Sequence, residues 1–296
     1  MQFRYILITA ARNEAEYIPR TIESVINQTV LPVRWVIVND SSTDATEAIV
    51  SGFARENGFI RLINMQENHG RDFSSKVHAL SAGIAACKDA EAEFLGILDA
   101  DITLDPSYYE KVQKEFEANP KLGIAGGVLY DVCKDKLLKR DWRPYTVAGG
   151  IQVFRRMCFD DIGGLLPLRY GSEDSVAEIS ARMKGWQVRS FRAITGHHIK
   201  PTGRAQGSPF SYAFKHGIRD YAYGTLFFFE LIKCMRRIKD RPFFIHAFVR
   251  ILGFVWSIVR REHRLVSPDF IRFYRREQLS RFLSGIAKPF GRLHRL

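Results

Sequence analysis

Short apolar runs alternate with amphipathic stretches through the first 120 residues. The apolar runs predict strands at 5–9, 33–38, 60–64 and 93–98. In the stretches between them, apolar residues recur every three or four positions, which predicts helices. Strands and helices that alternate in this way form an α/β domain with a mostly parallel central sheet and helices on both faces.

The alternation loosens after residue 120. Here the pattern predicts a helix that follows residues 171–174 and ends at 184–185, and strands at 123–129, 148–154 and 187–191. A charged, flexible loop is expected over 131–144, and a polar loop over 196–203. No low-complexity linker interrupts residues 1–207, so we assign them to one α/β domain.

The last third of the chain is aromatic and basic. Residues 208–296 hold 18 Lys and Arg against 6 Asp and Glu, whereas residues 1–207 hold 26 of each, so the net charge of +12 lies in the tail. The run 242–259 is apolar except for His246 and Arg250, and it is shorter than the roughly 20 residues that span a bilayer. An interfacial helix or a re-entrant hairpin fits this run better than a spanning helix.

The charge asymmetry predicts an anionic partner for the tail. Basic residues bind anionic lipids while aromatic residues enter the interface, so we expect 208–296 to be a helical extension that associates with a membrane surface. Packing on protein or oligomerisation is the alternative. Nucleic acid is not expected, because it favours stacking aromatics in a polar groove over a long apolar run.

Two further features indicate the compartment. The four cysteines have no paired or metal-ligand spacing, which is typical of a reduced compartment. A strand-like run begins near the N-terminus with no signal peptide before it. With the basic tail, these features predict the cytoplasmic face of the cell membrane.

Polar residues gather where the predicted strands of the first half end. Asp99, Ala100 and Asp101 follow the strand at 93–98, and the other strands are followed by Arg12-Asn13-Glu14, Asp40 and Arg71. The carboxyl ends of parallel strands meet at one edge, where open α/β sheets bind ligands. Two carboxylates two residues apart can hold a hard divalent cation and, through it, a diphosphate. No Gly-x-Gly-x-x-Gly or Walker sequence follows the first strand, which argues against a dinucleotide dehydrogenase or a P-loop enzyme.

These motifs resemble those of the inverting glycosyltransferases of family 2, which have the GT-A fold. The resemblance covers about residues 3–203 and depends on six motifs: Ala-Arg-Asn-Glu at 11–14, Val-Asn-Asp-Ser-Ser-Thr-Asp at 38–44, Asn-His-Gly-Arg at 68–71, Asp-Ala-Asp at 99–101, Gly-Gly at 149–150 and Glu-Asp at 173–174. It implies a GT-A catalytic domain at 1–207, with a nucleotide-sugar half at about 1–102 and an acceptor half at about 103–207. The Gln-x-x-Arg-Trp motif of the family's processive synthases is absent, which favours a non-processive member.

The resemblance also implies a role for each matching residue. Asp174 would be the general base, Asp40 would contact the nucleotide base, and Asp99 would lie near the ribose or the base. The other residues that would bind the donor are Ala11, Arg12, Glu14, Arg71, Ala100, Gly150 and Glu173. Without the resemblance, Asp40 is more typical of a helix cap and Asp174 of a carboxylate at a helix N-terminus.

A divalent cation, Mn²⁺ or Mg²⁺, is the cofactor that the resemblance implies. Asp101 would bind it, and His198 matches the place where many family members supply a histidine ligand. Imidazole completes a carboxylate and diphosphate site for Mn²⁺. His197 is the alternative ligand, because the sequence alone does not separate the two histidines.

The implied activity is transfer of a hexosyl or N-acetylhexosaminyl group from a nucleotide-sugar donor, by default a UDP-sugar, to a hydroxyl of a lipid-linked or glycan acceptor. One carboxylate base and no covalent nucleophile indicate a single displacement with inversion. The expected process is the synthesis of a polysaccharide or glycolipid of the cell surface. Two alternatives stay open. A sugar-nucleotide pyrophosphorylase carries a glycine-rich loop after the first strand, and residues 10–14 contain no glycine. The other is an inactive membrane-bound scaffold of the same fold.

Overall fold

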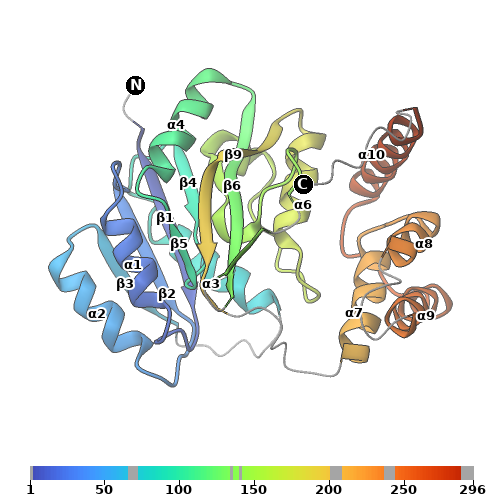
Figure 1. The fold of residues 1–296 in the computed structure, drawn as a ribbon, viewed down its shortest axis with the longest axis horizontal. Coiled ribbons are helices and arrows are strands. Elements are labelled where there is room, and N and C mark those ends of the chain that lie inside the picture. Colours follow the sequence, from blue (N-terminus) through green and yellow to red (C-terminus); the bar gives the residue numbers. More distant parts are fainter. Residues whose placement is uncertain are drawn as a thin grey trace. The chain divides into compact units, whose positions relative to one another are not determined.

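The structure is a computed structural model that describes residues 3–65, 73–133, 136–139, 142–200, 209–236 and 244–287. The chain divides into two compact units, Met1–Ala205 and Gln206–Leu296, close to the point where the composition changes. The first unit contains one sheet with its helices, and the described part of the second contains helices alone (Figure 1).

The first half of the first unit is a parallel sheet with its crossover helices (Figure 1). Its elements are β1 (Tyr5–Ala11), α1 (Ile18–Ile26), β2 (Arg34–Asn39), α2 (Thr46–Glu56), β3 (Ile60–Asn64), α3 (Phe73–Ala85) and β4 (Phe94–Ile97). The strands lie in the order β3-β2-β1-β4, and each neighbouring pair is parallel. β1, β2 and β4 are almost wholly buried, as expected of continuous apolar strands that are covered on both faces.

The second half adds strands of both directions. Its elements are β5 (Ile102–Leu104), α4 (Tyr108–Ala118), β6 (Leu122–Cys133), β7 (Lys136–Lys139), the 3-10 turn η1 (Gly149–Ile151), β8 (Val153–Arg155), α5 (Arg156–Asp161), α6 (Glu173–Met183) and β9 (Gln187–His198). The sheet continues in the order β4-β8-β6-β9-β5, and β7 pairs with β6. β8 is antiparallel to β4 and β6, whereas β6 and β9 are parallel to each other. The second half of the sheet is therefore mixed.

Three local predictions for this half are wrong. The loop expected at 131–144 is in part a hairpin, because β6 extends to Cys133 and β7 pairs with its end. The strand expected at 148–154 is shorter, since η1 precedes β8. The polar loop expected from residue 196 begins later, because β9 continues to His198 between β6 and β5. Strands that are distant in sequence supply the backbone hydrogen bonds in these places, so a polar local pattern does not prevent strand formation.

Close packing places α3 directly on the sheet. At Gly83 a Cβ atom would lie 2.7 Å from the Ile8 side chain, so only glycine lets the helix backbone approach β1 this closely. On the other side, Tyr5 of β1 stacks on Tyr109 of α4 with ring centroids 4.4 Å apart. Because α3 follows β3 in a parallel crossover, its N-terminal turns lie at the carboxyl edge of the sheet.

The second unit contains α7 (Pro209–Ala222), α8 (Phe227–Arg236), α9 (Ile245–Val259) and α10 (Pro268–Ala287). α7 and α9 cross at two glycines: a Cβ at Gly217 would lie 2.0 Å from the Arg250 carbonyl oxygen, and one at Gly253 would lie 2.1 Å from that of Phe214. The apolar run predicted at 242–259 forms α9 in the described residues. Among the described helices, none combines the length and apolar character that crossing a bilayer requires.

Candidate active site

The turn after β4 presents Asp99 and Asp101 at the carboxyl edge of the sheet. The backbone N–H of Asp99 donates to the Gly150 carbonyl oxygen at 3.0 Å, and the N–H of Ile199 donates to the Asp101 carbonyl oxygen at 2.9 Å. Two segments that follow far along the chain, η1 and the end of β9, are therefore held against this turn. They bring the glycine pair and the histidine pair to the two aspartates.

His198 is the histidine that faces Asp101. Its Nε2 lies 3.3 Å from Asp101 Oδ2, and its Nδ1 lies 3.3 Å from Asp131 Oδ1. Burial acts to raise the pKa of Asp101, but His198 and nearby lysines outweigh it, so the pKa lies below its ordinary value. His197 stacks on Tyr130 and its Nδ1 lies 3.9 Å from an oxygen of Asp105, because neighbours on a strand point to opposite faces.

Lys76 of α3 neutralises Asp99. Its Nζ lies 2.6 Å from Asp99 Oδ1, and both side chains are about one third exposed. Burial acts to lower the pKa of Lys76, but the carboxylates of Asp99, Glu173 and Asp174 outweigh burial and raise the pKa above its ordinary value. Lys76 therefore joins the Asp99 turn electrostatically to the start of α6.

The start of α6 carries Glu173 and Asp174. Asp174 Oδ1 accepts the backbone N–H of Ser175 at 2.7 Å, and burial raises the pKa of Glu173 although Lys76 opposes it. The glycine pair separates the two carboxylate groups. A Cβ at Gly149 would lie 2.7 Å from Asp174 Oδ2, and a Cβ at Gly150 would lie 2.6 Å from Asp99 Oδ2, so side chains at these positions would displace the carboxylates.

Asp40 lies buried at the end of β2 with one oxygen satisfied. Its Oδ2 accepts the Ser75 hydroxyl at 2.7 Å and lies 3.4 Å from a guanidinium nitrogen of Arg12. Its Oδ1 is buried and has no hydrogen-bond partner among the described residues. An unpaired buried carboxylate oxygen is unfavourable, so this atom is oriented to receive a donor from a ligand.

Glu14 is the second carboxylate with an unpaired oxygen. Its Oε1 accepts Lys200 Nζ at 2.6 Å, while Oε2 is buried without a hydrogen-bond partner in the described part of the chain. Burial raises the pKa of Glu14 despite Lys200, and the charges of Asp99 and Asp101 add to the increase. The Lys200 ammonium also lies 5.6 Å from the centroid of the Tyr17 ring.

The remaining predicted donor-binding residues lie around these carboxylates. Ala11 and Ala100 are buried and contribute backbone contacts: the Ala11 carbonyl oxygen accepts the N–H of Asp40 at 2.9 Å, and that of Ala100 accepts the Thr21 hydroxyl at 2.8 Å. Arg71 lies outside the described residues. Among the described residues, no group of three or more His, Cys, Asp or Glu side chains is arranged to hold a metal ion. A cation would therefore depend on donors from a ligand as well as on Asp101 and His198.

A cavity of about 300 Å³ opens beside Asp174. It is lined by α6 on one side and by the segment around Trp142 and Arg143 on the other. The Trp142 Nε1–H donates to the Ser190 hydroxyl at 3.0 Å, and the Arg192 guanidinium lies 4.3 Å from the centroid of the indole ring. These contacts hold the indole in place as a rigid wall of the cavity.

Glu178 joins this cavity to the glycine pair. One carboxyl oxygen accepts the backbone N–H of Val147 at 2.6 Å and the Gln152 side-chain amide at 3.3 Å, so the segment that contains η1 is held against α6. Burial raises the pKa of Glu178 to about 8, although the Val147 N–H and Arg182 oppose it. Glu178 lies one helical turn beyond Asp174, and it is buried at the wall of the cavity.

The structure thus gathers most of the predicted site residues at one edge of the sheet. Lys76, Lys200 and Glu178 were not predicted as site residues. Lys200 lies two residues after His198, which is a signal that sequence reasoning could have used. Lys76 and Glu178 lie within ordinary amphipathic helices, where one more charged residue has no distinguishing pattern.

Part of this chain resembles known proteins in sequence. Residues 6–174, more than half of the chain, match the family model Glycosyl transferase family 2. Over 120 residues the chain is 32% identical to a poly-β-1,6-N-acetyl-D-glucosamine synthase of Staphylococcus epidermidis. That match covers 40% of this chain and 27% of the relative, so it spans only a minor part of the relative's length.

Solved glycosyltransferase structures share the fold. The mannosyltransferase PcManGT from Pyrobaculum calidifontis, in complex with GDP-Man and Mn²⁺, has a TM-score of 0.57 at 16% identity, and the match covers 98% of this chain and 82% of that one. S. aureus TarS 1-349 in complex with UDP-GlcNAc has a TM-score of 0.55 at 15% identity, covering 92% of this chain and 79% of that one. Identities this low establish the fold alone, and the predicted GT-A fold is confirmed.

Proposed function

Because the chain belongs to glycosyltransferase family 2, we propose that it transfers a sugar from a nucleotide-sugar donor to an acceptor hydroxyl with inversion at the anomeric carbon. The observation that carries the proposal is the convergence of Asp99, Asp101, Asp174 and His198 at one edge of the sheet. Such an arrangement supports a donor site and a base in one centre, which a scaffold without activity does not need.

The nucleoside binds between the ends of β1, β2 and β4. The unpaired Oδ1 of Asp40 accepts an N–H of the base, while Ser75 and Arg12 hold the other oxygen in place. Asp99 lies near the ribose. UDP is the proposed nucleotide, in keeping with the UDP-GlcNAc complex of TarS, although PcManGT holds GDP-Man in the same fold.

Asp101 and His198 are the proposed ligands of a divalent cation, Mn²⁺ or Mg²⁺. A carboxylate oxygen and an imidazole nitrogen 3.3 Å apart suit Mn²⁺, and oxygens of the donor diphosphate would supply further ligands. When bound, the cation counters the negative charge that develops on the departing nucleoside diphosphate. Asp131, whose Oδ1 lies 3.3 Å from Nδ1 on the far side of His198, contributes negative charge beside the imidazole.

Asp174 is the proposed general base. Its carboxylate takes the proton of the acceptor hydroxyl while the hydroxyl oxygen bonds to the anomeric carbon and the bond from that carbon to the diphosphate oxygen breaks. The N–H of Ser175 orients one carboxylate oxygen, and Lys76 contributes positive charge nearby. The position of Asp174 between the glycine pair and the cavity supports this role.

The cavity beside Asp174 is the proposed acceptor site. Trp142 supplies an aromatic wall and Arg143 a cation, which suits a sugar of a glycan or lipid-linked acceptor. The S. epidermidis relative is named as a synthase of poly-N-acetylglucosamine. An N-acetylhexosaminyl donor is therefore the first to test, with a hexosyl donor second.

A thermal-shift panel tests the donor, and a transfer assay tests the base. UDP, GDP, UDP-GlcNAc and GDP-mannose are each added with and without Mn²⁺, and we expect stabilisation by one nucleotide only when Mn²⁺ is present. Asp174→Asn should keep that stabilisation but lose transfer by about 10²–10⁴-fold. Asp160→Asn, at an exposed position of α5, is the control. Full transfer by Asp174→Asn would refute the base assignment, and no response to any nucleotide would refute the donor site.

A further inference from the structure

The buried face of α9 carries the only charged residue of that helix. Its buried residues recur at helical spacing on one side: Ala247, Arg250, Gly253, Phe254 and Ser257. This side contacts α7, where Gly217 and Gly253 let the two backbones approach closely. The charged side chain therefore points toward the interior of the second unit.

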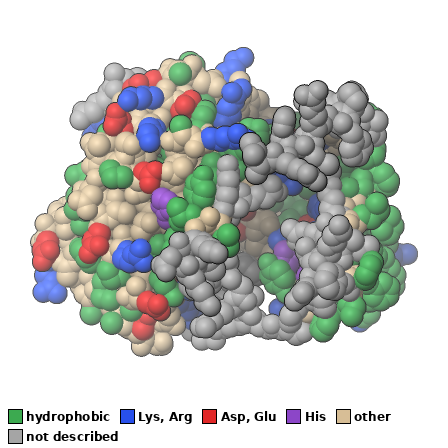
Figure 2. Space-filling model, in the orientation of Figure 1, with side chains coloured by type: hydrophobic (Ala, Val, Ile, Leu, Met, Phe, Trp, Pro, Cys, Tyr) green, Lys and Arg blue, Asp and Glu red, His purple; other side chains and the backbone are tan. Residues whose placement is uncertain are grey.

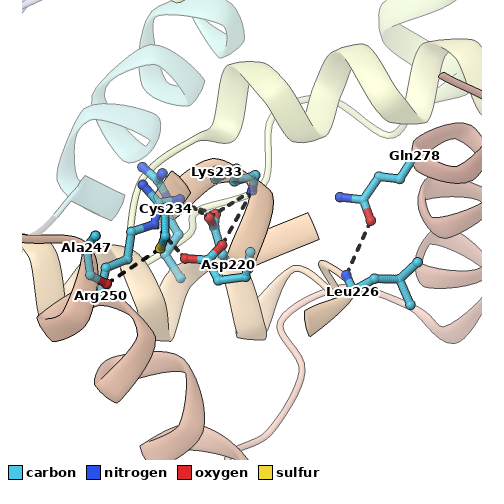
Figure 3. A network of polar contacts seen from close by, with 9 residues as sticks. Asp220, Leu226, Lys233, Cys234, Ala247, Arg250 and Gln278 are labelled. Carbon is cyan, nitrogen blue, oxygen red and sulfur yellow. Dashed lines mark hydrogen bonds and ion pairs between the residues drawn. The ribbon is translucent and has the colours of Figure 1, made fainter. Parts of the chain in front are cut away.

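Arg250 is held there by carboxylates from two other helices (Figure 3). Its Nε donates to Glu230 of α8 at 2.5 Å, and its Nη2 contacts Asp220 of α7. Lys233 Nζ lies 2.8 Å from the same Asp220 oxygen. Arg250 is only 4% exposed and Glu230 is fully buried, so the network fixes the rotation of α9 about its own axis.

The opposite face of α9 is apolar and exposed. Six large side chains form one stripe along the helix, with exposures between 37% and 74%: Ile245, Phe248, Leu252, Val255, Trp256 and Val259. Figure 2 shows hydrophobic side chains gathered at the right-hand edge of the view, where Figure 1 draws α8 and α9. A helix in water has polar residues outside and apolar residues inside. In α9 the one charged side chain, Arg250, lies inside while the exposed stripe is apolar, which is typical of a helix whose outer surroundings are apolar.

The surface next to the stripe is positively charged. Arg260 and Arg261 follow the last turn of α9 and are exposed, and the Arg260 guanidinium lies 4.6 Å from the centroid of the Trp256 indole ring. Residues 208–296 as a whole hold 18 basic against 6 acidic residues. The 15 residues of α9 reach about 22 Å, less than the roughly 30 Å of a bilayer core, so the stripe suits a helix lying in the plane of the interface.

We infer that the outer stripe of α9 inserts into the interfacial layer of an anionic lipid bilayer, with Arg260 and Arg261 on the headgroup phosphates. Charge favours this occupant over a second copy of the chain, because residues 208–296 of a second copy would carry the same excess of basic residues. The inference does not depend on the proposed function. It needs only the rotation of α9 that Arg250 fixes and the composition of the face that results.

Vesicle flotation tests the inference. The full chain is mixed with vesicles of equal parts phosphatidylcholine and phosphatidylglycerol, or of phosphatidylcholine alone. We expect it to float with the anionic vesicles, and less so at high salt. Phe248→Glu and Leu252→Glu should each lower the bound fraction about tenfold, since each removes a large apolar side chain from the lipid and adds a charge. Leu31→Glu, at an exposed position of the first unit, is the matched control and should float like the wild type.

Quenching of Trp256 by brominated lipid is the second measurement. Wild-type fluorescence should fall on anionic vesicles, and Trp256→Phe should lose most of this change because the other three tryptophans lie outside the stripe. Unfolding midpoints of all variants are compared, so that loss of the fold is recognised. Flotation of the Phe248→Glu variant equal to that of the wild type would overturn the inference. A lipid-free dimer that Phe248→Glu converts to a monomer would also overturn it, since the face would then belong to a second copy.

Discussion

Replacing Glu178 by glutamine tests how the glycine pair is held against α6. The Glu178 carboxyl accepts the Val147 N–H at 2.6 Å and the Gln152 amide at 3.3 Å, and the residue is only 3% exposed. Glutamine keeps an acceptor oxygen in this position but carries no charge at any pH. We therefore expect Glu178→Gln to fold with the segment in place and to differ from the wild type mainly in its response to pH.

The expected size follows from the raised pKa. Burial raises the pKa of Glu178 from 4.5 to about 8, so the folded protein keeps a proton that the unfolded chain releases between these values. The free energy of unfolding of the wild type should fall as the pH rises through this window and level off above it. One pKa unit corresponds to about 1.4 kcal/mol, so the loss is on the order of 3–5 kcal/mol. Glu178→Gln should lack this loss.

Urea unfolding at a series of pH values measures the effect. The two proteins should have similar stability near the acidic end of the window, and Glu178→Gln should be the more stable one at the alkaline end. Glu178→Ala should be destabilised at every pH by about 1–3 kcal/mol, because the Val147 N–H loses its acceptor. Glu117→Gln, at an exposed position of α4, is the control and should not alter the pH dependence. Parallel curves for the wild type and Glu178→Gln would refute the reasoning.

Three further substitutions test the donor side of the site. His198→Ala should weaken Mn²⁺-dependent nucleotide binding about tenfold or more in calorimetry, whereas His197→Ala should not; equal effects would contradict the assignment of the ligand. Lys76→Met removes the cation that pairs with Asp99 and should weaken nucleotide binding about fivefold, a modest effect because the pair is partly exposed. Unchanged binding would show that Lys76 is dispensable. Gly150→Ala places a methyl group 2.6 Å from the Asp99 carboxylate, so the free energy of unfolding in urea should fall by about 1–3 kcal/mol. An unchanged urea midpoint would disprove this prediction.

The sequence by itself determined the alternating half of the sheet and the edge at which the site lies. The segments that form β1, β2 and β4 are mostly apolar, and the polar residues that follow them include Asp40, Asp99 and Asp101. Each of these signals is local, because a buried parallel strand requires apolar neighbours along its own length. The carboxyl ends of such strands meet at one edge whatever the rest of the chain does.

Only the tertiary structure distinguished His198 from His197 and showed that Lys76 contacts Asp99. β9 is a strand as far as His198 because β6 and β5 pair with it, and its alternation directs one histidine to Asp101 and the other away. The partners come from distant parts of the chain, so no local pattern contains this information. Lys76 was missed for the same reason, since it lies on α3 and its partner Asp99 lies in the turn after β4.

The second unit separates the two kinds of information most clearly. From the sequence, 242–259 is an apolar run interrupted by His246 and Arg250. This pattern does not determine which face of the helix is buried and which is exposed. The structure decides it: Asp220 and Glu230 hold Arg250 inside, and the apolar stripe then lies on the outer surface. A buried charge is stable only with partners, and these partners are on other helices, so the rotation of α9 is a property of the packed unit rather than of its own residues.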